Sequence, residues 1–385
     1  MQERRDPEPQ STPPDLEGQP RRAKGVRARL PVNRWTLPAT LLAAAAIVLV
    51  LVSRPAGLGS ALPPVPGIPA TGPSVPEVAK PLERAVRPQA EPTATPLPTP
   101  TPDPDIRPLS MAVMPRVEDR GPAPVRMPGT PDPDPSTDHV IVVDGDSGAV
   151  LFQRNGYEPV APASLTKIMT ATLGIEHGSL SDHVTVNVDA SSMDGSSLMG
   201  LEPWFDVTFE DLLYGLMLPS GNDAALAIAR YVAGSDAKFV KMMNDKARWL
   251  GLRCTRFTNP HGLDEEGHYS CPADLVTMAR YAMQYPLFRQ VVETRHYDVR
   301  ESNISYTIYN VNPILDYPGA DGVKTGFSDN AGRALVATAV RNGHRVYVAF
   351  MRSENGAEAD GTLLLNWAFN SFDWPPGEAE SPGGQ

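Results

Sequence analysis

Ser164 and Lys167 stand three positions apart in the segment ASLTK and could form a nucleophile and its base. On a helix, residues at this spacing share one face, so the lysine amine can reach the serine hydroxyl. A serine hydroxyl is a weak nucleophile until a nearby base takes its proton. A lysine can be that base when burial and neighbouring positive charge lower its pKa. The pair therefore predicts acyl transfer through a serine ester.

Two further short segments could complete such a site. Ser220 and Asn222 lie in a predicted loop between helices, where they could form a second wall beside the nucleophile. Lys324, Thr325 and Gly326 fall on a predicted strand, whose edge offers a cation, a hydroxyl and an approach for a substrate backbone that no side chain obstructs. We therefore expect the start of the helix, the loop and the strand to lie together around one site.

The order of the three segments carries more information than any one of them. A motif that fixes only Ser and Lys is expected about once by chance in a chain of this length. It does occur again, at Ser235 and Lys238, where we interpret the serine as a helix N-cap. The Ser-x-Asn pattern also recurs at 328–330 and 353–355, too late in the chain to lie between nucleophile helix and strand. The ordered triple therefore selects the first occurrence of each.

The elements that must position these residues indicate an α+β fold. Alternating patterns predict strands near both ends of the folded region, and apolar residues at helical spacing dominate the middle. We expect an antiparallel sheet covered by helices, with an inserted all-helical lobe. The expected helices cover 164–177, 208–218, 222–233, 236–250, 272–284 and 357–372. The expected strands cover 139–144, 149–153, 184–188, 297–300, 306–310, 322–325, 333–340 and 345–351.

Composition separates this folded region from a proline-rich one. The chain has 42 prolines in 385 residues, and 23 of them fall between Pro55 and Pro135. Such a stretch is too poor in apolar side chains to bury a core. Residues 136–385 carry 18 basic and 31 acidic side chains, a net charge of −13. An acidic domain disfavours binding to nucleic acid, and we expect no such partner.

The N-terminal region predicts a membrane anchor. Residues 35–53 are uncharged and largely apolar, and 21–34 hold six Arg or Lys and no acid. The positive-inside rule then places the folded region outside the cytoplasm, on a single-pass cell-membrane protein. A cleaved signal peptide, which would release a secreted protein, is the alternative. The expected segments are a basic tail (1–34), a transmembrane signal anchor (35–53), a disordered Pro-rich linker (54–135), a catalytic domain (136–375) and a tail (376–385).

The motifs and their surroundings resemble the D-alanyl-D-alanine carboxypeptidases, low-molecular-weight penicillin-binding proteins of serine peptidase family S11. The resemblance spans roughly 138–370 and includes APASLTKIMTA, VTFEDLLYGLMLPSGNDAALAIA, FTNPHGLDEEGHYS and GVKTGFSDNAGRALVATA. It implies a β-lactamase/DD-peptidase-like fold and hydrolysis of peptidoglycan stem peptides that end in D-Ala-D-Ala. It also implies covalent inhibition by β-lactam antibiotics and a reaction that uses no metal or cofactor.

The resemblance assigns catalytic roles to four residues. Ser164 would be the acylated nucleophile and Lys167 its general base. Ser220 and Asn222 would relay a proton and bind the substrate amide.

The same resemblance assigns the strand to substrate binding. Lys324 and Thr325 would hold the terminal carboxylate, and Gly326 would let the substrate approach. The backbone N–H groups of Ser164 and Phe327 would form the oxyanion hole.

Two other functions compete with this one. A class A-like β-lactamase would carry a Glu-x-x-Leu-Asn loop between the second and third motifs, and none occurs between Asn222 and Lys324. A non-catalytic wall-binding protein with a relic site would tolerate loss of motif residues, but all of them are intact. Both observations favour the carboxypeptidase.

The chain has two cysteines, Cys254 and Cys271, with His261 and His268 between them. These spacings do not match the closely paired ligands of common zinc sites. An extracytoplasmic domain permits a disulfide. A disulfide, two free thiols and a metal site remain the alternatives, and we expect no metal in the active site.

Overall fold

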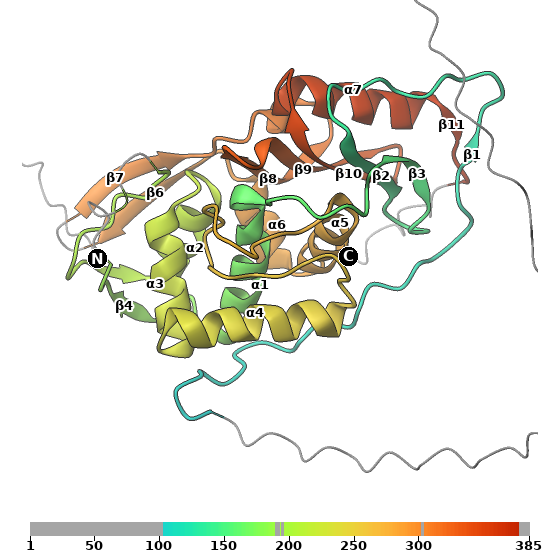
Figure 1. The fold of residues 1–385 in the computed structure, drawn as a ribbon. Coiled ribbons are helices and arrows are strands. Elements are labelled where there is room, and N and C mark those ends of the chain that lie inside the picture. Colours follow the sequence, from blue (N-terminus) through green and yellow to red (C-terminus); the bar gives the residue numbers. More distant parts are fainter. Residues whose placement is uncertain (1–102, 189–192, 194–195, 302–303, 377–385) are drawn as a thin grey trace, which may run out of the picture. The chain divides into compact units, whose positions relative to one another are not determined.

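The structure is a computed structural model that describes residues 103–188, 193, 196–301 and 304–376 (Figure 1). The expected anchor at 35–53 and the first part of the expected linker lie outside this range. Across the described residues, no helix combines the length and apolar character that crossing a bilayer requires.

A five-stranded antiparallel sheet forms from both ends of the domain, as predicted. Its strand order is β3-β2-β10-β9-β8, which leaves β8 at one edge. The strands are β2 (His139–Asp144), β3 (Val150–Arg154), β8 (Ala320–Ser328), β9 (Gly332–Arg341) and β10 (His344–Ser353).

The alternation within β2 explains how the sheet is covered on both faces. Val140 and Val142 pack with Leu365 of α7 (Ala357–Asn370), while Ile141 and Val143 join the core shared with the helical lobe. Figure 1 accordingly shows α7 on one side of the sheet and the lobe on the other.

The lobe surrounds a central buried helix. Here α1 (Lys167–His177) is buried along nearly its whole length, and a short 3-10 turn, η1 (Ala163–Thr166), precedes it. The helix expected at 164–177 therefore starts as a tighter turn. Its neighbours are α2 (Phe209–Met217), α3 (Asn222–Ala233), α4 (Asp236–Leu250), α5 (Pro272–Ala282) and α6 (Pro286–Glu293), of which α6 was not predicted.

Local signals explain where these helices begin. Thr208 and Asp211 form the expected capping box at the start of α2. The side chain of Ser235 accepts a hydrogen bond from the Lys238 backbone N–H at the start of α4. This contact confirms that the second Ser-x-x-Lys pattern in the sequence is a helix N-cap.

Three two-stranded sheets complete the described fold. They are β1 (Val125–Arg126) with β11 (Phe372–Asp373), β4 (His183–Thr185) with β5 (Asp206–Thr208), and β6 (His296–Glu301) with β7 (Ile304–Tyr309). A second 3-10 turn, η3, spans Pro313–Asp316. The strand expected at 184–188 is thus shorter and starts one residue earlier.

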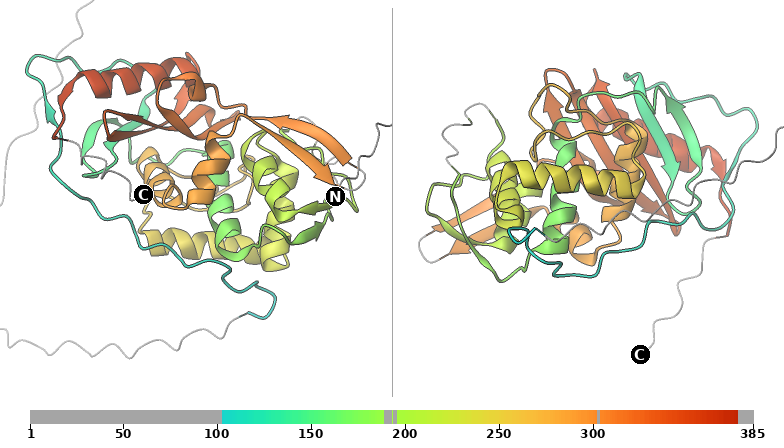
Figure 2. Two further views of the ribbon diagram at one scale, coloured as in Figure 1. Left: turned by 180° about the vertical axis from the view of Figure 1, so that it is seen from behind. Right: turned by 60° about the horizontal axis from the view of Figure 1, so that its bottom comes forward.

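The expected disordered linker is too long, because residues 103–135 lie against the domain. Arg107 N–H donates to Val232 O (2.8 Å), Ser110 N–H donates to Glu176 O (2.8 Å), and Met114 N–H donates to the Tyr285 hydroxyl (3.1 Å). Figure 2 shows this segment running along the helical lobe towards the sheet. It docks through backbone hydrogen bonds, through ion pairs such as Arg107–Asp182, and through isolated apolar side chains such as Ile106, so it has no periodic apolar face that the sequence could reveal.

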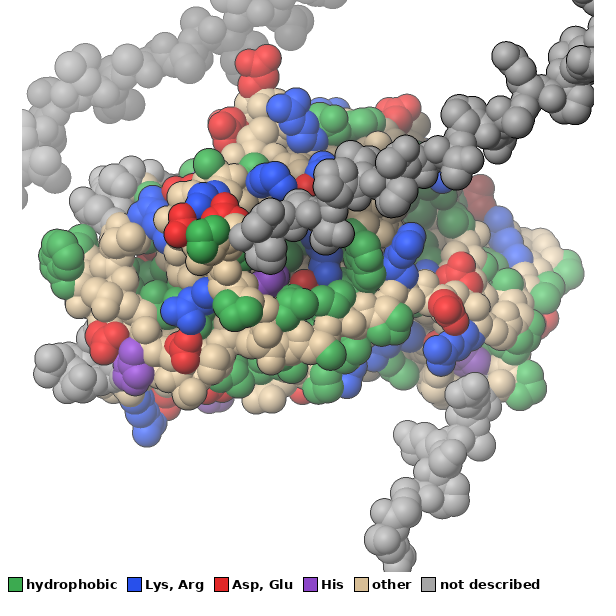
Figure 3. Space-filling model, turned by 90° about the horizontal axis from the view of Figure 1, so that it is seen from below, with side chains coloured by type: hydrophobic (Ala, Val, Ile, Leu, Met, Phe, Trp, Pro, Cys, Tyr) green, Lys and Arg blue, Asp and Glu red, His purple; other side chains and the backbone are tan. Residues whose placement is uncertain are grey.

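The face that contains α4 carries charges of both signs. Figure 3 shows Lys and Arg side chains interspersed there with Asp and Glu. Some of these opposite charges form ion pairs. Lys238 Nζ lies 3.0 Å from Asp103 Oδ1, and Lys241 Nζ lies 2.8 Å from Asp245 Oδ2. The expectation that the domain binds no nucleic acid stays a prediction.

Candidate active site

Ser164 and Lys167 meet where η1 runs into α1. Lys167 Nζ lies 2.8 Å from Ser164 Oγ, 2.7 Å from Asn222 Oδ1 and 2.8 Å from the His261 carbonyl oxygen. A neutral amine has two N–H groups and one lone pair. When the N–H groups go to Asn222 and His261, the lone pair faces the serine hydroxyl. The arrangement therefore suits proton transfer from Ser164 to Lys167.

The surroundings of Lys167 favour this neutral form. Its side chain is fully buried. Burial lowers the pKa of Lys167 well below its usual range, and the positive charge of Lys324 lowers it further, against an opposing effect of Asp223. A buried base with a lowered pKa can accept a proton near neutral pH.

The second wall holds Ser220 and Asn222. Ser220 lies in a left-handed turn (φ 66°), and Asn222 is the first residue of α3. Ser220 Oγ is buried and has no hydrogen-bond partner among the described residues. A buried hydroxyl without a partner is costly, so we expect a ligand or a proton in transit to satisfy it.

Asp223 builds this wall, although sequence reasoning missed it. The fully buried carboxylate accepts hydrogen bonds of 2.8–2.9 Å from three successive backbone N–H groups, which belong to Met199, Gly200 and Leu201. It thereby fixes the preceding loop beside Asn222. Its position directly after the Ser-x-Asn motif was the one available signal.

The edge strand β8 supplies the third wall. A Cβ atom at Gly326 would lie 3.1 Å from the backbone nitrogen of Ser164 and 3.2 Å from Ala163 Cβ. Glycine therefore allows the strand to approach the nucleophile closely. Thr325 and Phe327, on either side, both line the cleft. The oxyanion hole expected from the Ser164 and Phe327 N–H groups stays a prediction.

Lys324 lies behind this wall instead of on it. Its side chain is 1% exposed, its Nζ donates to Thr325 O (3.1 Å), and burial lowers its pKa to about 7. It is absent from the residues that line the cleft. The expected contact with a substrate carboxylate stays a prediction, whereas its electrostatic effect on Lys167 is direct.

The loop 259–268 forms the remaining support and was also missed. Gly262 has φ 94°, and a Cβ atom there would collide with Ala163 O. His268 Nδ1 accepts from Thr258 N–H (3.0 Å), and its Nε2 lies 2.8 Å from Thr166 Oγ1. The left-handed glycine was a detectable signal, since few other residues adopt that conformation.

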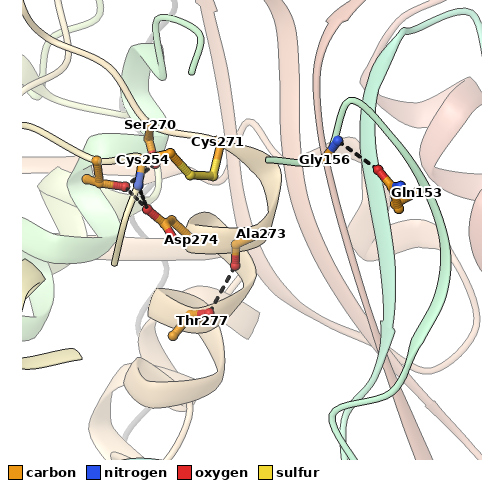
Figure 4. Close-up of a disulfide and its surroundings, with 9 residues drawn as sticks. Gln153, Gly156, Cys254, Ser270, Cys271, Ala273, Asp274 and Thr277 are labelled. Carbon is orange, nitrogen blue, oxygen red and sulfur yellow. Dashed lines mark hydrogen bonds between the residues drawn. A yellow bond between two sulfur atoms is a disulfide. The ribbon is translucent and has the colours of Figure 1, made fainter. Parts of the chain in front are cut away.

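A disulfide closes the neck of this loop. Cys254 and Cys271 are bonded, with Cα atoms 5.8 Å apart (Figure 4). Asp274 accepts a hydrogen bond from Cys254 N–H (2.8 Å) and lies near both sulfur atoms. The structure thus selects the disulfide among the three alternatives, because bonded sulfurs are not thiolate ligands.

These walls enclose an open cleft of about 600 Å³ with Ser164 on its surface. The structure brings the predicted residues Ser164, Ser220, Asn222, Thr325, Gly326 and Phe327 together there, with Lys167 and Lys324 directly behind.

A family model, two relatives and one solved structure are similar to this chain. Residues 127–355 match the model of peptidase family S11, D-alanyl-D-alanine carboxypeptidase. D-alanyl-D-alanine carboxypeptidase DacF of Bacillus subtilis is 38% identical over 245 residues, 61% of this chain and 63% of the relative. D-alanyl-D-alanine carboxypeptidase DacA of Escherichia coli is 35% identical over 264 residues, 64% of each chain. The chain thus spans less than two thirds of the length of these relatives. The crystal structure of the Streptomyces K15 DD-transpeptidase aligns with a TM-score of 0.59 at 32% identity, over 62% of this chain and 99% of that one.

Proposed function

The chain belongs to the D-alanyl-D-alanine carboxypeptidase family, peptidase family S11, and we propose that it hydrolyses peptidoglycan stem peptides ending in D-Ala-D-Ala through an acyl-enzyme. The observation that carries this proposal is the fully buried Lys167 amine 2.8 Å from Ser164 Oγ, beside the positive charge of Lys324. β-Lactam antibiotics would acylate the same serine and act as covalent inhibitors.

The acylation step follows from these contacts. Ser164 Oγ attacks the carbonyl carbon of the penultimate D-Ala, and its proton passes to Lys167 Nζ. The tetrahedral intermediate then collapses, the peptide C–N bond breaks, and the proton goes to the departing D-Ala amine. Ser220 is positioned to relay that proton, because its buried hydroxyl lacks a fixed partner among the described residues. Water then attacks the serine ester, which releases the shortened peptide and restores the serine hydroxyl.

A matched pair of serine variants tests the proposal. Ser164→Ala should abolish both D-Ala release from a D-Ala-D-Ala peptide and labelling by a fluorescent penicillin. Ser235→Ala, which removes only a helix cap, should retain both. Loss of both activities in the Ser235 variant, with retention in the Ser164 variant, would overturn the assignment.

The same assay separates the competing functions. A wall-binding protein with a relic site would stay unlabelled, and a β-lactamase would become labelled and then release hydrolysed drug within its turnover time.

The similarity to a DD-transpeptidase raises a further candidate, in which an amine instead of water accepts the acyl group. Addition of an amine acceptor during D-Ala release would reveal a transfer product in that case.

We further propose a single-pass cell-membrane location with the catalytic domain outside the cytoplasm. The six basic residues in 21–34 and the uncharged segment 35–53 support it. A reporter that is active only outside the cytoplasm should work when it is fused after Gln385. Activity only from a cytoplasmic reporter would contradict the proposal, and a shortened chain in the medium would indicate cleavage.

A further inference from the structure

Lys167 depends on a backbone carbonyl for its orientation. One N–H of its amine is directed to Asn222 Oδ1 at 2.7 Å, and the other is directed to the His261 carbonyl oxygen at 2.8 Å. The lone pair faces Ser164 only while both acceptors stay in place. Asn222 is held by α3, whereas His261 lies in the loop 259–268, outside any helix or strand. The position of this carbonyl therefore decides how well the base is aimed.

Packing on one side only does not fix the carbonyl. The outer side of the segment 259–261 borders an open hollow of about 600 Å³, which Val240 and Asn244 of α4 also line. A loop segment with open space on one side keeps rotational freedom in its peptide planes unless hydrogen bonds remove it. Two buried side chains supply such bonds.

We propose that Thr170 and Asn259 are positioning residues that aim the His261 carbonyl at Lys167. The inference rests on the proposed function and adds to it two groups that set the direction of the general base. Neither residue is among those that line the cleft, so they act through Lys167 and not on the substrate.

Thr170 fixes the peptide plane that precedes His261. It lies three residues after Lys167 on α1, so the two side chains share a face of the helix. Its fully buried hydroxyl donates to the Pro260 carbonyl oxygen at 2.6 Å. Because the proline ring already fixes φ at Pro260, this hydrogen bond removes the freedom that remains in ψ.

Asn259 fixes the next peptide plane, which carries the His261 carbonyl itself. The Gly262 N–H belongs to that plane and donates to Asn259 Oδ1 at 2.7 Å. In a trans peptide the N–H and the C=O point in opposite directions, so this bond turns the His261 oxygen away from Asn259. Asn259 is held in turn, because its Nδ2 donates to Leu263 O and to Glu265 Oε2, both at 3.0 Å.

Loss of either bond should have two separable effects on Lys167. With the His261 carbonyl free to turn away, one amine N–H lacks its acceptor, the lone pair faces Ser164 for less of the time, and acylation slows. The carbonyl also binds an ammonium more strongly than an amine, so its loss should lower the pKa of Lys167 further. The charged groups that act on Lys167 are Lys324 of β8 and Asp223 of α3, and both stay in place. Burial lowers the pKa of the His261 ring to about 4, so that ring is neutral at higher pH.

A matched pair of threonine variants tests the inference. Thr170→Val keeps the shape of the side chain and removes the hydroxyl. Thr172→Val makes the same change at another buried threonine of α1, whose hydroxyl donates within the helix to Ile168 O (2.7 Å). We expect Thr170→Val to slow penicillin acylation of Ser164 about ten-fold and to move the acidic limb of its pH profile to lower pH. Thr172→Val should keep the wild-type rate and limb, and Thr170→Ser, which retains a hydroxyl, should keep both.

A third variant tests the other positioning residue. Asn259→Ala should slow acylation and move the acidic limb in the same direction as Thr170→Val. A shifted limb separates positioning from partial unfolding, because unfolding lowers the amount of active protein without moving the limb. An unchanged rate in Thr170→Val or in Asn259→Ala, an unmoved limb in either, or equal slowing in Thr172→Val would overturn the inference.

Failure of the proposed function gives a different result. If the wild type forms no penicillin adduct on Ser164, the proposed function is wrong. The inference is then decided by a readout that needs no activity, the pH titration by NMR of the Lys167 Cε resonance in protein that contains isotope-labelled lysine. The resonance is assigned by its loss in Lys167→Gln. A lower pKa of Lys167 in Thr170→Val than in Thr172→Val supports the positioning role, and equal values refute it.

Discussion

Acidification should destabilise the fold through His268. This residue is 5% exposed and bridges the nucleophile turn and the loop 259–268. Its Nδ1 accepts a hydrogen bond from Thr258 N–H, so Nε2 carries the proton and can donate to Thr166 Oγ1. A second proton on Nδ1 would face the Thr258 N–H donor and break that contact. Burial accordingly lowers the pKa of His268 from 6.5 to about 4.

The direction of the effect follows from proton uptake. Between pH 6.5 and about 4 the unfolded chain binds a proton at this histidine, whereas the folded protein does not. Stability from His268 is therefore full above pH 6.5 and is lost as the pH falls towards 4. Integration of this difference from about pH 7.5 to about pH 4.5 gives a loss of about 2.5 kcal/mol in the free energy of unfolding.

Urea unfolding at these two pH values measures that loss. His268→Gln keeps a donor and an acceptor but does not titrate, so it should lose about 2.5 kcal/mol less than the wild type between the two pH values. His261, whose pKa burial also lowers to about 4, titrates in both proteins. Loss of His268 removes only a smaller cause of that lowering, so the difference between the two proteins reports chiefly on His268. His296→Gln, at an exposed histidine on β6, should retain the wild-type dependence. An equal loss in the wild type and in His268→Gln would refute the reasoning.

Three further predictions follow from the site. Lys324→Gln removes a positive charge beside Lys167, so the pKa of Lys167 should rise. The acidic limb of the pH profile of penicillin acylation should then move to higher pH. An unmoved limb would contradict the electrostatic role of Lys324. Gly326→Ala would place a Cβ atom 3.1 Å from the nucleophile's backbone nitrogen and should slow acylation about ten-fold with little change in Tm, whereas an unchanged rate would show that the close approach is not needed. Replacement of Cys254 and Cys271 by Ser should lower the free energy of unfolding by ~3 kcal/mol in urea, and thiol titration of the denatured, unreduced protein should detect no free thiol.

The sequence predicted those parts of the site that depend on residues close together in the chain. Ser164 and Lys167 are three positions apart, and helical geometry alone brings them together. Gly326 was assigned a close approach to substrate, and the structure shows that it also gives a close approach to the nucleophile turn. The sheet formed from both chain ends was likewise predictable, because alternation in segments such as β2 assigns each residue to one face.

The unpredicted parts depend on long-range contacts. The backbone carbonyl oxygen of His261 accepts a hydrogen bond from Lys167 Nζ. Every residue has such a carbonyl, so the residue type at this position could not indicate the contact. The burial of Lys324 depends on how α6 and η1 pack on β8, which no local pattern encodes. The proline-rich composition of residues 103–135 predicts a linker without a core. Hydrogen bonds and ion pairs nevertheless hold the first part of this segment to the lobe, and β1 pairs with β11.

The central claim is that Ser164 alone forms the acyl-enzyme and that Lys167 activates it. Peptide mapping by mass spectrometry after brief exposure to a penicillin tests this claim most directly. We expect one adduct per chain, on the peptide that contains Ser164, and a greatly slowed adduct in Lys167→Gln. An adduct on Ser220 or Ser235, or an undiminished rate in Lys167→Gln, would contradict the account.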